Sequence, residues 1–463
     1  MRRILVLVLP LLLSIPAAQA QNKTPSPSRL HDALGLPSWL HLSFEHRSRY
    51  ETVDNQFRAD GTGGDQVVAF RTLAFLEARH RAWRVGGEFM DSRLALDDRG
   101  TPVNTTQVDT AELLQAYLAW SQKAPSDARL GMEIIGGRQT IDLGNRRLVA
   151  RNSFRNTINS FTGLDARLES PGRWQARGFL VLPVIRLPDT FNALASGETR
   201  FDEEDLESHF GGLFFRHDSL AMDAKGEVYF LYLHEDDDED LETSDRQLYT
   251  PGFRIFRDPA KGRIDYELES IFQFGQSRAT AAATDTMDLD HFAHQQHGQI
   301  GYTFDLPWSP RFLVQYDYAS GDRDPDDDDN ERFDTLFGAR RWEYGPTGIW
   351  GAFARSNINT PGYRLFVRPA DAVSAFIAHR LFWLASSTDA WTASGVRDRT
   401  GQSGTFIGHQ LEASVQWSAI PRNLILEAGW AYLIKGEFAE DAPNAPADKG
   451  DSNYLYTQIT FQF

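Results

Sequence analysis

Apolar and polar residues alternate along many segments of this chain. In GHQLEASVQWS, residues 408–418, every second residue from Leu411 to Trp417 is apolar, and the residues between them are polar. The segment RIDYELESIFQFG, residues 263–275, has nearly the same alternation. Because successive side chains of a β-strand point to opposite faces, this pattern predicts strands with one apolar and one polar face.

Applied to the whole chain, the pattern predicts 18 strands. Most are long enough to cross the apolar layer of a bilayer when tilted, which takes about 10 residues. The predicted strands cover residues 38–51, 65–79, 82–92, 109–120, 129–140, 162–170, 174–183, 208–217, 224–234, 245–257, 261–276, 290–305, 310–320, 357–368, 371–386, 406–419, 421–434 and 451–463.

The connections between these strands alternate in length. Short turns such as 80–81, 171–173 and 258–260 alternate with long connections such as 52–64, 141–161 and 321–356. Membrane barrels have short periplasmic turns and long extracellular loops, whereas both ends of a soluble β-sandwich face water alike. We therefore predict an all-β fold, an antiparallel transmembrane β-barrel of about 18 strands.

The ends of the chain agree with an outer-membrane location. Arg2 and Arg3 precede an apolar stretch that ends before Ala18-Gln19-Ala20, which predicts a signal peptide over residues 1–20. Residues 21–37 are then expected to form a short periplasmic segment, and residues 38–463 the barrel. The last strand alternates and ends in Phe463, which resembles the assembly signal of bacterial outer-membrane barrels.

Composition narrows the chemistry of the interior. The chain has no cysteine, which excludes disulfides and thiolate metal sites, and we expect no cofactor. Its net charge is −17, yet only six of its 47 basic residues are lysines. Arginine keeps its charge at low dielectric and binds carboxylates in two-point contacts, so an arginine-rich lumen suits anions.

One short segment concentrates arginines. GRQTIDLGNRRLVARNSFRNTINSF, residues 137–161, holds five arginines and one acid, Asp142. If the connection 141–161 folds inward, its arginines lie in the lumen without acids beside them, and a ring of arginines selects anions. The alternative is an exposed basic loop that contacts lipopolysaccharide phosphates. The five arginines are Arg138, Arg146, Arg147, Arg151 and Arg155.

The strands add further inward-facing charges. The predicted registers place twelve arginines and nine acids on the polar faces, and most of them are expected to neutralise one another across neighbouring strands. Four of these arginines join the candidate pore lining: Arg254, Arg364, Arg368 and Arg380.

Two acidic runs carry much of the negative charge. They cover residues 235–240 and 322–331, both in long connections that we place outside the cell. Neither run has the spacing of an EF-hand loop, so we interpret them as solvated loops, with calcium binding as the weaker alternative.

Three segments resemble the alginate export family of outer-membrane β-barrels. They are residues 137–169, with GRQ, RL and FRNT; residues 316–351, with SGD, an acidic loop and LFG; and YELESIFQFGQ, residues 266–276. The resemblance implies an 18-stranded, monomeric barrel that passes an anionic polyuronate through an electropositive constriction. It assigns Arg138 and the four arginines of connection 141–161 to that constriction.

The sequence therefore favours a passive outer-membrane channel for an anionic polysaccharide or oligosaccharide. The alternative is a general or nutrient-uptake porin with weak anion selectivity. An enzyme is disfavoured, because His291, His294 and His297 of HFAHQQH do not all share one strand face, and neither GxSxG nor HExxH occurs. Expected partners are membrane lipid, lipopolysaccharide, the anionic solute and the outer-membrane assembly machinery, with no nucleic acid and a monomeric state.

Overall fold

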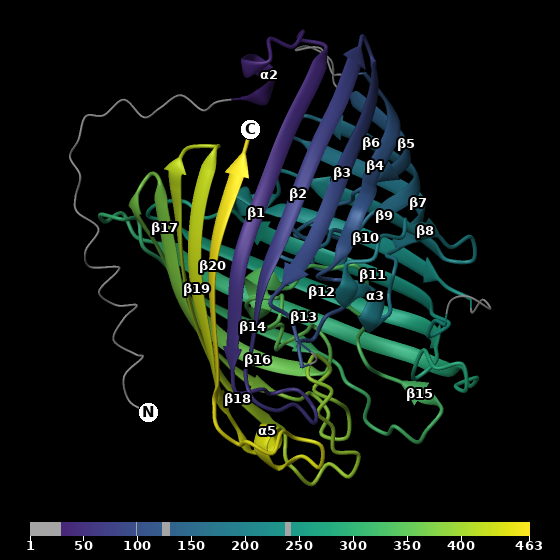
Figure 1. The fold of residues 1–463 in the computed structure, drawn as a ribbon, viewed down its shortest axis with the longest axis vertical. Helices are drawn as coiled ribbons and strands as arrows, with labels where there is room; N and C mark the ends of the chain where they lie inside the picture. Colours follow the sequence, from purple (N-terminus) through teal and green to yellow (C-terminus); the bar gives the residue numbers. More distant parts are fainter. Residues whose placement is uncertain (1–28, 99, 123–129, 237–241) are drawn as a thin grey trace.

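The protein is a closed antiparallel barrel (Figure 1). The computed structural model describes residues 29–98, 100–122, 130–236 and 242–463. The expected signal peptide and the start of the expected periplasmic segment lie outside these residues. The long strands are β1 (Leu40–Asp54), β2 (Asp65–His80), β3 (Trp83–Ala95), β4 (Asp109–Gln122), β5 (Gly131–Gln139), β6 (Phe161–Ser170), β7 (Trp174–Ile185), β9 (His209–His217), β10 (Lys225–His234), β11 (Gln247–Arg257), β12 (Ile264–Ser277), β13 (Leu289–Thr303), β14 (Arg311–Ala319), β16 (Ile358–Ala370), β17 (Val373–Trp383), β18 (Phe406–Ile420), β19 (Leu424–Lys435) and β20 (Ser452–Gln462).

Each long strand pairs with the next one along the chain, and the last pairs with the first. Strand β1, purple in Figure 1, lies beside β20, yellow, with Glu45 opposite Gln462 and Asp54 opposite Asn453. Two further strands of two residues lie in loops: β8 (Glu203–Glu204) extends the pairing of β7, and β15 (Asp329–Asn330) pairs with β13. Closure leaves the wall without an unpaired edge.

The predicted barrel of 18 strands is confirmed. Every predicted strand is present, and no predicted limit differs from the observed one by more than three residues, as for 371–386 against Val373–Trp383. The segment predicted over residues 208–217 forms β9. Alternation alone located the strands because each strand has one apolar face and one polar face.

The outer face of the wall is apolar and the inner face is polar. In β9 and β10, Leu213 and Val228 are exposed by 66% and 54%, while Glu227 beside Val228 is 3% exposed. Exposed apolar side chains on a closed barrel face lipid, and the alternate residues face the lumen.

The short connections gather at one end of the barrel and the long ones at the other, as predicted. The helical segments are short: α2 (Leu30–Ala33), α3 (Phe191–Ser196), η1 (Ala221–Asp223), α4 (Arg341–Tyr344) and α5 (Glu437–Asp441). Among the described residues, none of the helices has the length and apolar character needed to cross a bilayer.

A compact apolar core forms where the long loops meet. Phe57, from the loop after β1, stacks on Trp391 with ring centres 5.5 Å apart and meets Trp350 edge-on at 5.0 Å. Phe353 also stacks on Trp391, with ring centres 5.6 Å apart. Because these side chains come from three separate loops, their burial fixes the loops relative to one another.

Candidate functional site

Two long loops fold into the barrel. The first inward loop, residues 140–160, follows β5, and the second inward loop, residues 320–357, follows β14. Arg47 on the inner face of β1 donates to the Ser153 carbonyl at 2.7 Å, and Arg49 donates to the Phe154 carbonyl at 2.7 Å. From the second loop, the Ile349 amide donates to Glu51 of β1 at 3.0 Å. Of the two alternatives for connection 141–161, an inward fold and an exposed basic loop, these contacts favour the inward fold.

The two inward loops bind each other through their backbones. The Phe337 amide donates to the Leu148 carbonyl at 2.9 Å, and the Ala339 amide donates to the Arg146 carbonyl at 2.9 Å. Gly338 lies between these bonds, and a Cβ there would lie 1.8 Å from the Arg147 oxygen. A glycine is therefore required for the close approach.

Arg147 joins the first inward loop to a distant part of the wall. It is 4% exposed, and its Nη1 lies 2.7 Å from Glu267 Oε1 on β12. It also pairs with Glu269 of β12 and with Glu343 of the second inward loop. Glu343 pairs in turn with Arg355. A guanidinium thus ties both inward loops to β12.

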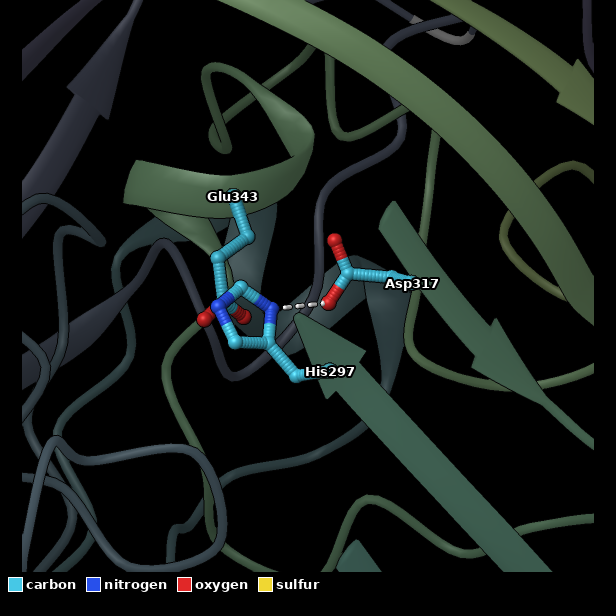
Figure 2. A group of neighbouring side chains, drawn as sticks. All are labelled: His297, Asp317 and Glu343. Carbon is cyan, nitrogen blue, oxygen red and sulfur yellow. Dashed lines mark hydrogen bonds and ion pairs between the residues drawn. The ribbon is translucent and has the colours of Figure 1, made fainter. Parts of the chain in front are cut away.

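His297 lies within this charged group. Figure 2 shows its imidazole between Asp317 and Glu343, with Nδ1 2.6 Å from Asp317 Oδ1. One ligand atom from each of the three side chains lies within 4.8 Å of the others, which is compatible with a metal ion. Arginines already occupy the carboxylates, however: Arg380 Nη2 lies 2.7 Å from Asp317 Oδ2, and Glu343 has two arginine partners. These guanidinium groups repel a further cation. We therefore interpret the group as a network of ion pairs that holds the second inward loop against the wall, and not as a metal site.

The other histidines of HFAHQQH are separated as the sequence analysis predicted. His291 is buried on the inner side of β13, whereas His294 stacks on Tyr318 with ring centres 5.3 Å apart. His291 and His297 are six residues apart on the same face. The three side chains therefore do not converge on one point.

The prediction that the four arginines of connection 141–161 have no acids beside them is wrong for Arg147 and Arg151, and Arg138 on β5 also has acidic partners. Arg138 pairs with Glu204 at 2.8 Å and with Glu112 at 2.5 Å, Arg147 pairs as above, and Arg151 Nη2 lies 2.6 Å from Glu88 Oε1. These acids lie on other strands or loops, so only the closed fold brings them to the arginines. Arg146 and Arg155 form no ion pair within the part of the chain that the structure describes.

The four wall arginines divide in the same way. Arg254 lies 2.9 Å from Glu227 and 3.0 Å from Glu267, and Arg380 pairs with Asp317. The expected cross-strand neutralisation therefore holds for both. Arg364 is buried and donates to the Glu343 carbonyl at 2.8 Å, while Arg368 is exposed near a short turn. Neither has an acidic partner among the described residues.

Arg155 belongs to a group of arginines that we call the open arginine cluster: Arg58, Arg155, Arg186 and Arg340. Within the described ranges, none of the four forms an ion pair. Asn159 Oδ1 accepts from Arg186 at 3.1 Å and also from Arg155, and Arg58 donates to the Trp350 carbonyl at 2.6 Å. Arg340 makes no hydrogen bond through its side chain to any described residue, and it lines a cavity of about 370 Å³.

Like charges in the open arginine cluster repel one another. Burial, followed by the charges of Arg186 and Arg340, holds the pKa of the Arg155 guanidinium well below its usual range. Burial and neighbouring guanidinium groups also lower the pKa of Arg340 and of Arg58 to about 10. A guanidinium keeps its proton in proteins, so all four arginines are charged, and no ion pair with a described carboxylate neutralises them. Nothing in the sequence around Arg58, Arg186 or Arg340 marked them as partners of Arg155.

A closed barrel with a lipid-facing apolar exterior and a charged, loop-narrowed interior defines an outer-membrane channel of Gram-negative type. The chain belongs to the alginate export family, whose sequence profile matches residues 38–450. The family and the fold are those of a transport channel and not of a known enzyme class. Both place the protein in the bacterial outer membrane, in contact with lipid.

Solved structures of outer-membrane proteins share the fold. OccAB3 of Acinetobacter baumannii is 13% identical, with a TM-score of 0.59 and coverage of 92% of this chain and 99% of that one. OccK8 (OprE) of Pseudomonas aeruginosa is 11% identical, with a TM-score of 0.58 and coverage of 92% and 98%. OpdK of Pseudomonas aeruginosa, solved with vanillate, is 10% identical, with a TM-score of 0.56 and coverage of 92% and 98%. No curated protein matches the chain.

Proposed function

We propose that the protein passes an anionic polysaccharide or oligosaccharide, of the polyuronate class, by passive diffusion through an arginine-lined constriction. The observation that carries this proposal is the open arginine cluster. Its members come from the loop after β1, the end of β7 and both inward loops, and they form no ion pair with any described carboxylate. Family membership supports the solute class.

The chemistry of the cluster suits a polyuronate. Such a polymer carries one carboxylate on each sugar, and a guanidinium fork binds a carboxylate through two parallel hydrogen bonds. Arg155 and Arg340 would contact the solute directly, and Arg146 would add charge beside them. Arg138, Arg147 and Arg151 would position the first inward loop.

The wall arginines complete the proposal. Arg254 and Arg380 would stabilise the ion-pair network of the inner wall, because each pairs with an inward-facing acid. Arg364 would support α4 through its bond to the Glu343 carbonyl. Arg368, near a short turn, would add positive charge at the periplasmic side.

Block of single-channel current by an oligouronate tests the proposal. The matched block by a neutral oligosaccharide of equal length is the reference. In the double variant R155Q/R340Q, we expect the half-blocking concentration of the oligouronate to rise about tenfold, since two charge-assisted contacts are lost. The neutral sugar should be unaffected. The control R200Q/R399Q removes two exposed loop arginines, with exposed side-chain fractions of 56% and 53%.

The same experiment separates the alternative function. A general or nutrient-uptake porin would show equal block by both sugars and no effect of R155Q/R340Q. That result would contradict the proposed solute class and leave the outer-membrane channel itself intact.

We also propose that the last strand is recognised by the outer-membrane assembly machinery and that lipopolysaccharide surrounds the outer rim of the barrel. A further proposal is that the barrel acts as a monomer. Closure of β1 on β20 supports a monomer, because no sheet edge needs a second chain. Light scattering of the detergent-solubilised protein tests it: a mass of two or three chains would contradict it.

A further inference from the structure

Three buried carboxylates meet near the long-loop end of the barrel. Asp109 and Glu112 lie on β4, and Asp202 precedes β8 in the loop between β7 and β9. One carboxylate oxygen from each lies within 4.8 Å of the others. Their residues are 1%, 1% and 6% exposed. Three negative charges at this spacing, away from water, repel one another strongly.

The partners of the three carboxylates are unequal. Glu112 accepts from Arg138 Nη1 at 2.5 Å and from the Asp202 amide at 3.0 Å. Asp202 Oδ1 accepts from the Leu187 amide at 2.9 Å. Asp109 is the exception, because both its oxygens are buried and neither accepts a hydrogen bond from any described residue. A buried carboxylate without a donor is costly unless something else neutralises it.

The nearby arginines do not supply that neutralisation through contact. Arg138 is shared between Glu112 and Glu204. Arg186 donates to the Thr105 carbonyl at 2.8 Å and to Asn159 Oδ1 at 3.1 Å. Neither arginine forms an ion pair with Asp109 or Asp202 within the described ranges. Both oxygens of Asp109 therefore remain without a hydrogen-bond donor among the described residues and can bind another cation.

We propose that Asp109, Glu112 and Asp202 bind one calcium ion. Calcium binds six to eight oxygens at about 2.3–2.6 Å, so ligand oxygens up to about 5 Å apart can share one ion, whereas magnesium needs a tighter octahedron. The two free oxygens of Asp109 provide a bidentate ligand. Glu112 and Asp202 each contribute an oxygen, and water completes the shell.

The ion ties the loop between β7 and β9 to the start of β4. It holds Asp202 against the wall, beside the contact of Arg138 with Glu204. The proposal concerns loop anchoring and does not depend on which solute the channel passes. It also differs from calcium binding by the acidic run 322–331, in which residues 326–329 are exposed.

Calorimetric titration of calcium chloride into the chelator-treated full chain in detergent tests the proposal. Wild type should bind one ion. D109N should bind it at least tenfold more weakly, and D202N should show the same loss of affinity as D109N. The control D328N removes an exposed carboxylate of the acidic run and should leave the site unchanged. No saturable binding by wild type, equal binding by D109N, or binding of magnesium in preference to calcium would overturn the proposal.

Thermal unfolding gives a second readout. In chelator, D109N should melt at or above the temperature of wild type, because an amide relieves the repulsion among the carboxylates. In calcium, the order should reverse. A D109N protein that melts below wild type in both conditions would show that Asp109 stabilises the fold without an ion, and would overturn the site.

Discussion

Arg147 Nη1 lies 2.7 Å from Glu267 Oε1, although the loop that contains Arg147 and the strand that contains Glu267 begin far apart around the barrel. Arg147 belongs to the loop after β5, and Glu267 lies on β12, six long strands further around the wall. The same loop receives hydrogen bonds from Arg47 and Arg49 on β1. The first inward loop thus crosses the lumen, and its charges fix where it lies.

Replacing Arg147 by methionine should release this loop. The change leaves Glu267, Glu269 and Glu343 buried with one guanidinium fewer, and breaking a buried ion pair costs about 3–5 kcal/mol. Urea unfolding in detergent should show a loss of that size. The control R167M removes an arginine that has two acidic partners, one fewer than Arg147, and is 39% exposed, so it should cost about 1 kcal/mol or less. Equal losses would contradict the role of burial.

Adding a methyl group at Gly338 should separate the two inward loops. The new Cβ would lie 1.8 Å from the Arg147 carbonyl oxygen. The hydrogen bonds that the Phe337 and Ala339 amides donate to the first inward loop must therefore break. Two backbone hydrogen bonds contribute about 2 kcal/mol, so hydrogen exchange at these amides should speed up roughly 30-fold in G338A. In G87A, where the nearest atom is 3.7 Å away, exchange at both amides should stay as in wild type. Slow exchange in G338A would contradict the docking.

An arginine on the outer face should destabilise the barrel only where lipid covers the wall. Leu213, at the centre of β9, is 66% exposed, and Leu206, in the preceding loop, is 75% exposed. L213R should lower the free energy of unfolding in lipid by about 2–4 kcal/mol, the cost of a cation near the bilayer midplane. L206R should have little effect. If both cost the same, the outer face of β9 does not lie in the membrane.

Asp322 makes the stability of the second inward loop depend on pH. Burial, followed by the Asp389 carboxylate and more weakly Asp327, raises the pKa of Asp322 to about 6. The charges of Arg332 and Arg397 act in the opposite direction. Between about pH 4 and pH 6 the folded chain keeps a proton that the unfolded chain releases. The contribution of Asp322 to stability therefore falls as the pH rises through this window.

The variant D322N removes this titration. Its melting temperature relative to wild type should increase from pH 4 to pH 7, as measured by circular dichroism in detergent. The exposed Asp328 should give no such trend in D328N. A constant difference between D322N and wild type across this range would show that Asp322 titrates normally.

The wall was predictable from the sequence, whereas the interior was not. The alternation of apolar and polar side chains within each strand is enough to locate that strand. Strands such as β9 and β12 were therefore predictable from local sequence. The partners of Arg138 and Arg151 could not, because Glu204 and Glu88 approach them only after closure and loop folding. The strands β8 and β15 were also missed, because two residues are too few to show alternation.

The open arginine cluster illustrates the same limit. Arg155 was singled out by its neighbours in the sequence, and the structure leaves it without an ion pair among the described residues. Arg58, Arg186 and Arg340 join it from three other segments. Their common feature is that none forms an ion pair with a described carboxylate, which depends on the positions of all the loops together.

The reversal potential in a potassium chloride gradient across a planar bilayer tests the central claim most directly. The wild-type channel should be anion-selective, and R155Q/R340Q should reduce the ratio of chloride to potassium permeability roughly fivefold or more, since each charge contributes about 1 kcal/mol even in water. R200Q/R399Q should keep the wild-type value. A cation-selective wild type, or a selectivity that R155Q/R340Q leaves unchanged, would contradict the account.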